Sequence, residues 1–303
     1  MNTPSPAATV NSPESSAASA LPDALDPSFL RSLSSRACCF FLDYDGTLAP
    51  IVNEPDRAFI SEETRQVVSA LAAAHPVGLV SGRSIDKLRA FLQIGGLFFA
   101  GSHGVDIVGP AGEEIDGPDP VSLVGPGALE ALKHARAALD AALGDVPGYL
   151  TEDNVYCISA HYRMVDPAQH ERVRATTLAL LQELPLLHHK EGKMVHELRP
   201  AVDWHKGKAV EWLLQLLRRS SASADSLYPI YLGDDVADED AFRAVQALGG
   251  VGIKVARGSV SSDATAATRS LEQPQVVHFL KALVDSREAS VVQQDSESAI
   301  GPR

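Results

Sequence analysis

The first candidate chemistry in the sequence lies in two aspartates, Asp43 and Asp45, that follow an apolar segment at 37–42. Two carboxylates two residues apart can act on one electrophilic atom, one as a nucleophile and the other as a proton carrier. Gly46 lets backbone amides approach an oxyanion, and the Thr47 hydroxyl can donate a hydrogen bond to it. Two alternatives are a turn closed by Asp side chains and a calcium loop, although the glycine required at its sixth position is missing.

A second pair of acids, Asp234 and Asp235, follows another apolar segment at 227–232. Carboxylates at the ends of two neighbouring strands can share a hard divalent cation, and an all-oxygen ligand set favours Mg²⁺ over Zn²⁺. Asp238 and Glu239 follow closely, but acids in the first turn of a helix are also favourable without a metal. This second segment therefore indicates a metal site only in combination with the first.

Two further residues, Ser81 and Lys206, stand where the pattern predicts the start of a helix. A hydroxyl beside helix N-terminal amides is a suitable seat for a phosphate. A lysine in a first turn opposes the helix dipole, and a nearby phosphate or carboxylate would explain it; a solvated surface lysine is the alternative. Together with the two acid pairs, these residues suit phosphoryl transfer from a monoester.

The segments around these residues alternate between strand and helix. Short apolar runs predict buried strands, and helical periodicity predicts helices between them. The strands are expected at 37–42, 77–80, 97–100, 227–232 and 251–255, and the helices at 61–74, 84–92, 206–218, 238–247 and 276–284. Such alternation predicts an α/β fold with a parallel sheet, in which the acids, the hydroxyl and the lysine meet at one edge.

The rhythm of strand and helix changes in the middle of the chain. Here the pattern predicts an α+β unit with helices at 129–143 and 168–184 and strands at 148–151, 155–162 and 194–198. We therefore expect a discontinuous core domain at 26–114 and 198–288, interrupted by an inserted cap domain at 115–197. Residues 1–25 and 289–303 are rich in small and polar residues and are expected to be disordered tails.

The composition narrows the classes of partner. The chain has 303 residues, with 26 basic and 39 acidic side chains and a net charge of −13, which argues against a nucleic acid or an anionic membrane as partner. No apolar run approaches the ~18 residues of a spanning helix, and the first residues resemble neither a signal nor a transit peptide. Three cysteines, Cys38, Cys39 and Cys157, do not form a disulfide framework, so a reducing cytoplasm is expected.

The order and spacing of these motifs resemble a known superfamily, the haloacid-dehalogenase-type phosphatases. Within it, the sequence is similar to the trehalose-6-phosphate phosphatase family over roughly residues 36–285. The supporting stretches are Asp43-Tyr44-Asp45-Gly46-Thr47, Ser81-Gly82-Arg83, Gly101-Ser102-His103-Gly104, His161-Tyr162-Arg163, Gly192-Lys193, Glu197-Leu198-Arg199-Pro200, Lys206-Gly207-Lys208 and Gly233-Asp234-Asp235. The resemblance implies a Rossmann-like parallel-sheet core of haloacid dehalogenase type with an inserted α+β cap.

The resemblance also implies the roles of the core residues. Asp43 would be the nucleophile that forms an aspartyl-phosphate, and Asp45 would protonate the departing sugar oxygen and then activate water. Mg²⁺ would be held by Asp43, the backbone carbonyl of Asp45 and Asp234, with Asp235 in support. The expected phosphate-binding residues are Thr47, Ser81 and Lys206.

In the cap, Glu152, Arg163, Lys193 and Glu197 match positions that hold the sugar hydroxyls in this family. The family usually has lysine where this sequence has Asn154. Two further residues are candidates for substrate binding, Arg83 and His103. His103 lies between glycines and is expected to stabilise a turn, while His161 is expected to pair with backbone inside a strand.

The implied activity is Mg²⁺-dependent hydrolysis of trehalose 6-phosphate to trehalose and phosphate by a phosphoric monoester hydrolase. Two alternatives stay open at this point. One is a phosphatase of another sugar phosphate, such as sucrose phosphate, and the other is a non-catalytic sugar-phosphate-binding protein on a degenerate core.

Overall fold

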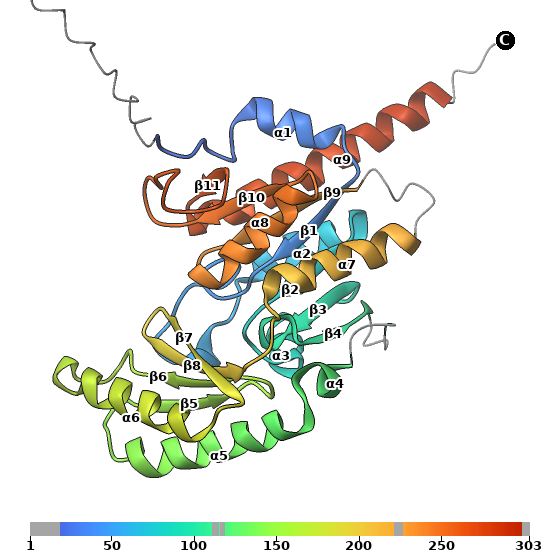
Figure 1. The fold of residues 1–303 in the computed structure, drawn as a ribbon. Helices are drawn as coiled ribbons and strands as arrows, with labels where there is room; N and C mark the ends of the chain where they lie inside the picture. Colours follow the sequence, from blue (N-terminus) through green and yellow to red (C-terminus); the bar gives the residue numbers. More distant parts are fainter. Residues whose placement is uncertain (1–18, 111–114, 116–118, 221–226, 299–303) are drawn as a thin grey trace, which may run out of the picture.

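The computed structural model describes residues 19–110, 115, 119–220 and 227–298, and two β-sheets organise them (Figure 1). The larger sheet has the strand order β11-β10-β9-β1-β2-β3-β4, and the smaller has the order β5-β6-β8-β7. The strands of the larger sheet are β1 (Cys38–Leu42), β2 (Val77–Val80), β3 (Leu97–Gly101), β4 (Asp106–Val108), β9 (Tyr228–Gly233), β10 (Val251–Val255) and β11 (Arg269–Leu271).

Strand β1 is the centre of the larger sheet. It pairs in parallel with β2 on one side and with β9 on the other, and β4 pairs antiparallel with β3 at the sheet edge. The chain builds outward from β1 through β2 and β3, and later outward from β9 through β10 and β11. The direction of winding therefore reverses between β1 and β9, which is where open α/β sheets form a ligand-binding crevice.

Alternate side chains of β1 face opposite layers of helices, as the period of a strand requires. Phe40 and Leu42 belong to one buried cluster, with Val68 of α2 and Phe279 of α9. Phe41 belongs to the other cluster, which α7 and α8 supply. The helices of the core are α1 (Pro27–Ser34), α2 (Glu62–Ala74), α3 (Ile85–Leu92), α7 (Lys206–Ser220), α8 (Glu239–Ala247) and α9 (Val276–Ser298).

The smaller sheet forms a second domain below the core in Figure 1. Its strands are β5 (Leu150–Asp153), β6 (Ile158–His161), β7 (Leu187–Gly192) and β8 (Val195–Pro200), and its helices are α4 (Pro120–Val124), α5 (Pro126–Leu143) and α6 (His170–Glu183). One face of this sheet packs on α5 and α6; Leu198 of β8, for example, joins their buried cluster. Strand alternation then turns Glu197 toward the opposite face, on the side of the core.

Several elements differ from the sequence-based expectation. The sequence pattern does not predict five elements of the structure: α1, β4, α4, β7 and β11. The strand expected at 155–162 begins only at Ile158, because the chain makes a turn with Val155 at φ 69°. Strand β8 continues to Pro200, past the cap boundary expected at 197.

Part of each expected tail belongs to the fold. Leu21 and Ala24 donate backbone hydrogen bonds to Val260 and Ser270, and Ala24 is fully buried. The expectation of a tail up to residue 25 is therefore wrong for residues 19–25. Helix α9 runs to Ser298, into the segment where a tail was expected, and residues 1–18 and 299–303 lie outside the described part of the chain. No helix among the described residues is both long enough and apolar enough to cross a membrane.

Candidate active site

The carboxylate of Asp43, directly after β1, faces the ammonium of Lys206, the first residue of α7. Lys206 Nζ lies 2.8 Å from Asp43 Oδ1, and both side chains are buried. Burial raises the pKa of Asp43 well above its usual range; the nearby Asp238 carboxylate adds to this effect and Lys206 opposes it. Further positive charge at this place would favour the ionised, nucleophilic form of Asp43.

Asp238 is a member of this centre that the sequence interpretation did not include. Its Oδ1 accepts hydrogen bonds from Lys206 Nζ at 2.7 Å and from the Tyr231 hydroxyl at 2.6 Å, and its Oδ2 accepts from the Asp235 amide at 2.9 Å. Burial disfavours the charge on Lys206, but Asp238 and Asp43 outweigh burial and raise the pKa of that ammonium. Asp238 therefore fixes Lys206 as a cation beside Asp43.

Two hydroxyls lie at the same edge of the sheet as Asp43. Ser81, directly after β2, is buried, and its Oγ accepts from the Arg83 amide at 3.2 Å. Thr47 is fully buried, and its Oγ1 has no hydrogen-bond partner among the described residues. A buried hydroxyl without a partner is unusual and marks a place where a ligand oxygen would complete its hydrogen bonding. Both hydroxyls thus fit the expected seat for a phosphoryl group.

Asp45 makes a two-point ion pair with Arg83. Arg83 Nε and Nη2 each lie 2.7 Å from one oxygen of the Asp45 carboxylate, and Nη2 also donates to the Pro55 carbonyl at 2.9 Å. The guanidinium is itself buried, with Nη1 at 3.7 Å from Glu152 of the cap. Arg83, expected to contact substrate, is thus engaged in orienting the carboxylate expected to move protons.

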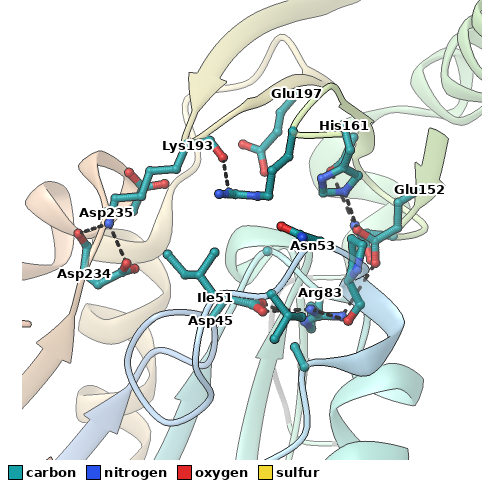
Figure 2. Close-up of a pocket in the computed structure, with 17 residues that line it drawn as sticks. Asp45, Ile51, Asn53, Arg83, Glu152, His161, Lys193, Glu197, Asp234 and Asp235 are labelled. Carbon is teal, nitrogen blue, oxygen red and sulfur yellow. Dashed lines mark hydrogen bonds and ion pairs between the residues drawn. The ribbon is translucent and has the colours of Figure 1, made fainter. Parts of the chain in front are cut away.

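A pocket between the core and the cap opens over Asp45 and Asp234 (Figure 2). The core lines it with Arg83 and with the loop that carries Ile51 and Asn53. The cap contributes polar side chains from β5, β6, β8 and the turns beside them: Glu152, Asn154, Ser159, His161, Arg163, Lys193 and Glu197. The four cap residues expected to hold a sugar are among them, and all face this one cavity.

Glu152 is held by cations and a histidine from both domains. Its Oε1 accepts from Lys87 of α3 at 2.6 Å, and its Oε2 lies 2.8 Å from His161 Nε2. Burial opposes its ionisation, but the hydrogen bond from His161 and the charge of Lys87 outweigh burial and lower the pKa of Glu152 to about 2. The prediction that His161 pairs with backbone is wrong: its ring braces Glu152 and lines the pocket. Alternation with the buried residues of β6 is the sequence signal that could have shown this.

Glu197 has an equally constrained environment. Arg199 donates to its Oε2, and His103 Nε2 lies 3.1 Å from its Oε1. Burial opposes the charge, yet His103 and Arg199 hold the pKa of Glu197 far below its usual range. Burial also lowers the pKa of His103 to about 4. His103 occupies the left-handed turn at φ 60°, as its neighbouring glycines suggested, and also reaches across to the cap.

Asn154, the departure from the family pattern, lies at the junction of the two domains. It is buried, its Oδ1 accepts from the Ser84 amide at 3.4 Å, and its backbone carbonyl accepts from the Ser102 hydroxyl. Ser84 is the N-cap of α3, so the Asn154 side chain serves one of that helix's unpaired amides. This residue therefore joins cap to core while it lines the pocket.

Residues 41–275 match the sequence model of the trehalose-phosphatase family. The probable trehalose-phosphate phosphatase D of Arabidopsis thaliana is 40% identical over 256 residues, which cover 83% of this chain and 68% of that protein. Trehalose-phosphate phosphatase B of the same plant is also 40% identical, over 83% of this chain and 67% of that protein. The chain belongs to the trehalose-phosphatase family.

Solved structures agree with this family at the level of the fold. The C-terminal domain of a C. albicans trehalose-6-phosphate phosphatase superposes with a TM-score of 0.74 at 22% identity, covering 88% of this chain and 98% of that one. A trehalose-6-phosphate phosphatase related protein gives 0.65 at 23% identity, covering 84% and 99%. The predicted fold class, a parallel-sheet core of haloacid dehalogenase type with an inserted α+β cap, is confirmed.

The trehalose-phosphatase fold leaves room for a cation beside Asp43. Carboxylate oxygens of Asp43, Asp234 and Asp238 lie within 4.8 Å of one another, and such hard oxygen ligands fit Mg²⁺. The Asp234 carboxylate lies directly over Gly46, where any side chain would collide with it. Gly46 also has φ 77°, a conformation that favours glycine. Burial raises the pKa of Asp234 to about 6, while Lys193 opposes this shift.

Two of the expected metal ligands, Asp43 and Asp234, belong to this cluster. Asp45 is expected to contribute its backbone carbonyl, and its side chain binds Arg83. Asp235, expected in support, accepts a hydrogen bond from the Val236 amide. Asp238 belongs to the cluster, but Lys206, Tyr231 and a backbone amide already contact its oxygens. The residues present thus fit a cation held chiefly by Asp43 and Asp234.

Proposed function

We propose that this protein hydrolyses trehalose 6-phosphate to trehalose and inorganic phosphate. The observation that carries the proposal is the convergence of Asp43, Lys206 and Asp234 at the ends of β1 and β9 beneath a pocket lined by cap carboxylates. The first three suit a phosphoryl group, and the carboxylates suit sugar hydroxyls. The family and the names of the Arabidopsis relatives support the same substrate.

The chemistry follows from the positions of two carboxylates. An oxygen of Asp43 attacks phosphorus, the bond from phosphorus to the sugar oxygen breaks, and Asp45 gives that oxygen a proton. Asp45 then takes a proton from a water molecule, which attacks the aspartyl-phosphate and releases phosphate. Because Arg83 donates to both oxygens of the Asp45 carboxylate, Asp45 must leave that guanidinium to carry a proton. Substrate in the pocket is the natural trigger for this movement.

The other core residues hold the transferring group. Lys206, Ser81 and Thr47 would contact its oxygens, and the cation of Lys206 would stabilise the charge that develops there. A Mg²⁺ ion bound by Asp43, Asp234 and the Asp45 carbonyl would supply further positive charge for the phosphoryl group. The Asp235 side chain would keep this loop in shape through its bond to the Val236 amide.

The cap residues would recognise the disaccharide. Glu152, Glu197, Arg163 and Lys193 offer charged hydrogen-bonding groups to sugar hydroxyls, and His161 orients the first of them. The cap would also keep bulk water from the aspartyl-phosphate until hydrolysis. A cytoplasmic location stays a prediction; the three cysteines are free thiols and buried.

Phosphate release from a panel of sugar phosphates, with and without Mg²⁺, tests the proposal. We expect turnover of trehalose 6-phosphate to exceed that of sucrose phosphate and of glucose 6-phosphate, and to stop after EDTA treatment and dialysis. A preference for another sugar would leave the chemistry and change the substrate. Binding without turnover of any member would leave only a sugar-phosphate-binding protein.

A further inference from the structure

One lysine of the cap, Lys193, contacts the loop after β9 that carries Asp234 and Asp235, which we call the metal loop. Lys193 Nζ lies 2.5 Å from Asp234 Oδ2 and 2.8 Å from the Asp234 backbone carbonyl oxygen (Figure 2). The Lys193 side chain is about half exposed, at 47%, whereas that of Asp234 is only 7% exposed. The ammonium thus reaches from the solvent side of the pocket onto a buried carboxylate.

The backbone of the cap holds this lysine in place. Lys193 lies at the tip of the hairpin formed by β7 and β8, and its carbonyl accepts from Arg163 Nη2 at 2.6 Å. The next residue, Met194, has φ 65°, so the turn is tight. At the other side of the tip, a Cβ on Gly192 would lie only 3.5 Å from Asp235 Oδ2. The tip as a whole therefore sits against the metal loop.

This contact occupies one oxygen of a carboxylate that the proposed metal ion would also use. The described carboxylates that gather here are those of Asp43, Asp234 and Asp238. Because Lys206 and the Asp235 amide already contact Asp238, a cation would bind chiefly to Asp43 and Asp234. The ammonium of Lys193 already donates to Asp234 Oδ2. A cation bound at that oxygen would meet a like charge within hydrogen-bond distance, and the two positive charges would repel each other.

We propose that Lys193 and Mg²⁺ compete for Asp234, so that metal binding releases the hairpin tip from the core. In the metal-free protein the ion pair between Lys193 and Asp234 holds the cap against the metal loop. When the metal binds, Lys193 is freed to face the pocket, where a phosphorylated sugar offers it new partners. Metal would then bind before substrate. This inference rests on the proposed function, because it takes Asp234 as a metal ligand.

Calorimetric titration of chelator-treated protein with Mg²⁺ alone tests the competition. Lys193→Met removes the competing charge and keeps an apolar stem, so we expect Mg²⁺ to bind about three- to tenfold more tightly than to wild type. Lys193→Arg keeps a cation and should stay within about twofold of wild type. Lys133→Met is the matched control, because it removes one cap charge from a lysine that pairs with Glu130 on an exposed surface.

Hydrogen exchange provides a second readout on the wild-type protein itself. Mg²⁺ should speed exchange of the amides at the tip, residues 192–195, in wild type and should leave it unchanged in Lys193→Met. Equal or weaker Mg²⁺ binding by Lys193→Met would overturn the competition, as would Mg²⁺ binding to wild type without a change at the tip. Absence of saturable Mg²⁺ binding in all variants would instead remove the metal site of the proposed function.

Discussion

The core and the cap hold their charged residues in different ways. In the core, Lys206 contacts Asp43 and Asp238, and all three side chains belong to the same domain. In the cap, Glu152 depends on Lys87 of the core as well as on His161 of its own sheet. Glu197 similarly combines Arg199 of its own strand with His103 of the core.

This difference separates chemistry from recognition. The groups proposed to break the phosphate ester are complete within the core, while those proposed to read the sugar reach their final positions only where the two domains meet. Damage to the core should therefore affect every substrate. Damage to the cap should affect the disaccharide most, and should also weaken the contact between the domains.

The largest expected effect is at the nucleophile. Asp43→Asn should lower kcat by roughly 10⁴- to 10⁶-fold for every phosphomonoester, because an amide is a far poorer nucleophile than a carboxylate. Asp45→Asn should lower it less, by about 10²- to 10⁴-fold, since it removes only a proton carrier. Steady-state turnover and the melting temperature are measured on both. Normal turnover by folded Asp43→Asn would refute the assignment.

The sequence predicts the core better than the cap for a physical reason. Asp43 and Asp234 directly follow short apolar strands, and parallel strands bring their carboxyl ends to one edge wherever the helices lie. The cap contacts depend on how two domains meet. Asn154 reaches Ser84, and Lys87 reaches Glu152, only through that arrangement, and no local pattern encodes it.

Within the core, the sequence predicts poorly those residues whose type suits both a structural role and a role in the site. Asp238 suits the first turn of a helix, and it does form a capping box with Asp235. The same side chain also fixes Lys206, a contact across 32 positions of sequence. The buried end of the N-terminal segment was missed because Ala24 is small and stands among polar and small residues, so no apolar period marks it.

A cap variant should change selectivity rather than chemistry. Glu197→Ala should lower kcat/KM for trehalose 6-phosphate by roughly 5- to 150-fold, because a lost partner for a buried polar group costs ~1–3 kcal/mol. A small generic phosphomonoester that does not reach the cap should be affected much less. The ratio of the two kcat/KM values is the decisive quantity. An equal loss for both substrates would show that the cap does not read the sugar.

Acid should destabilise the fold through His103, whose buried imidazole faces Glu197 of the cap. Burial and the charge of Arg199 lower the pKa of His103 from 6.5 to about 4, so the fold favours its neutral form. Its contribution to stability is complete above about pH 6.5 and is lost as pH falls toward 4, by ~2 kcal/mol at pH 5. Urea unfolding at about pH 7.5 and 5 measures this. In His103→Gln the free energy of unfolding should fall less between these two pH values than in wild type. An equal fall in both proteins would show that a group other than His103 causes the pH dependence.

Truncation tests the buried end of the N-terminal segment. Deleting residues 1–25 should lower the free energy of unfolding by about 1–3 kcal/mol, because the carbonyls of Val260 and Ser270 lose their partners. Deleting residues 1–18 is the matched control and should change stability little, given their polar and small composition. The comparison is made by urea unfolding. Equal stability of the two truncated proteins would contradict a structural role for residues 19–25.

The smallest expected effect is at Asn154, where the two domains and the pocket meet. Asn154→Lys would extend a cation into a cavity that holds Glu152 and Glu197, so kcat/KM for trehalose 6-phosphate should stay the same or rise slightly. The variant should lose about 1 kcal/mol of stability, because the Ser84 amide at the start of α3 loses its acceptor. Asn154→Ala loses that bond without adding the cation and should match Asn154→Lys in stability. If kcat/KM falls equally in both variants, the amide itself is needed for recognition, and the core-to-cap contact at Asn154 is part of how the disaccharide is bound.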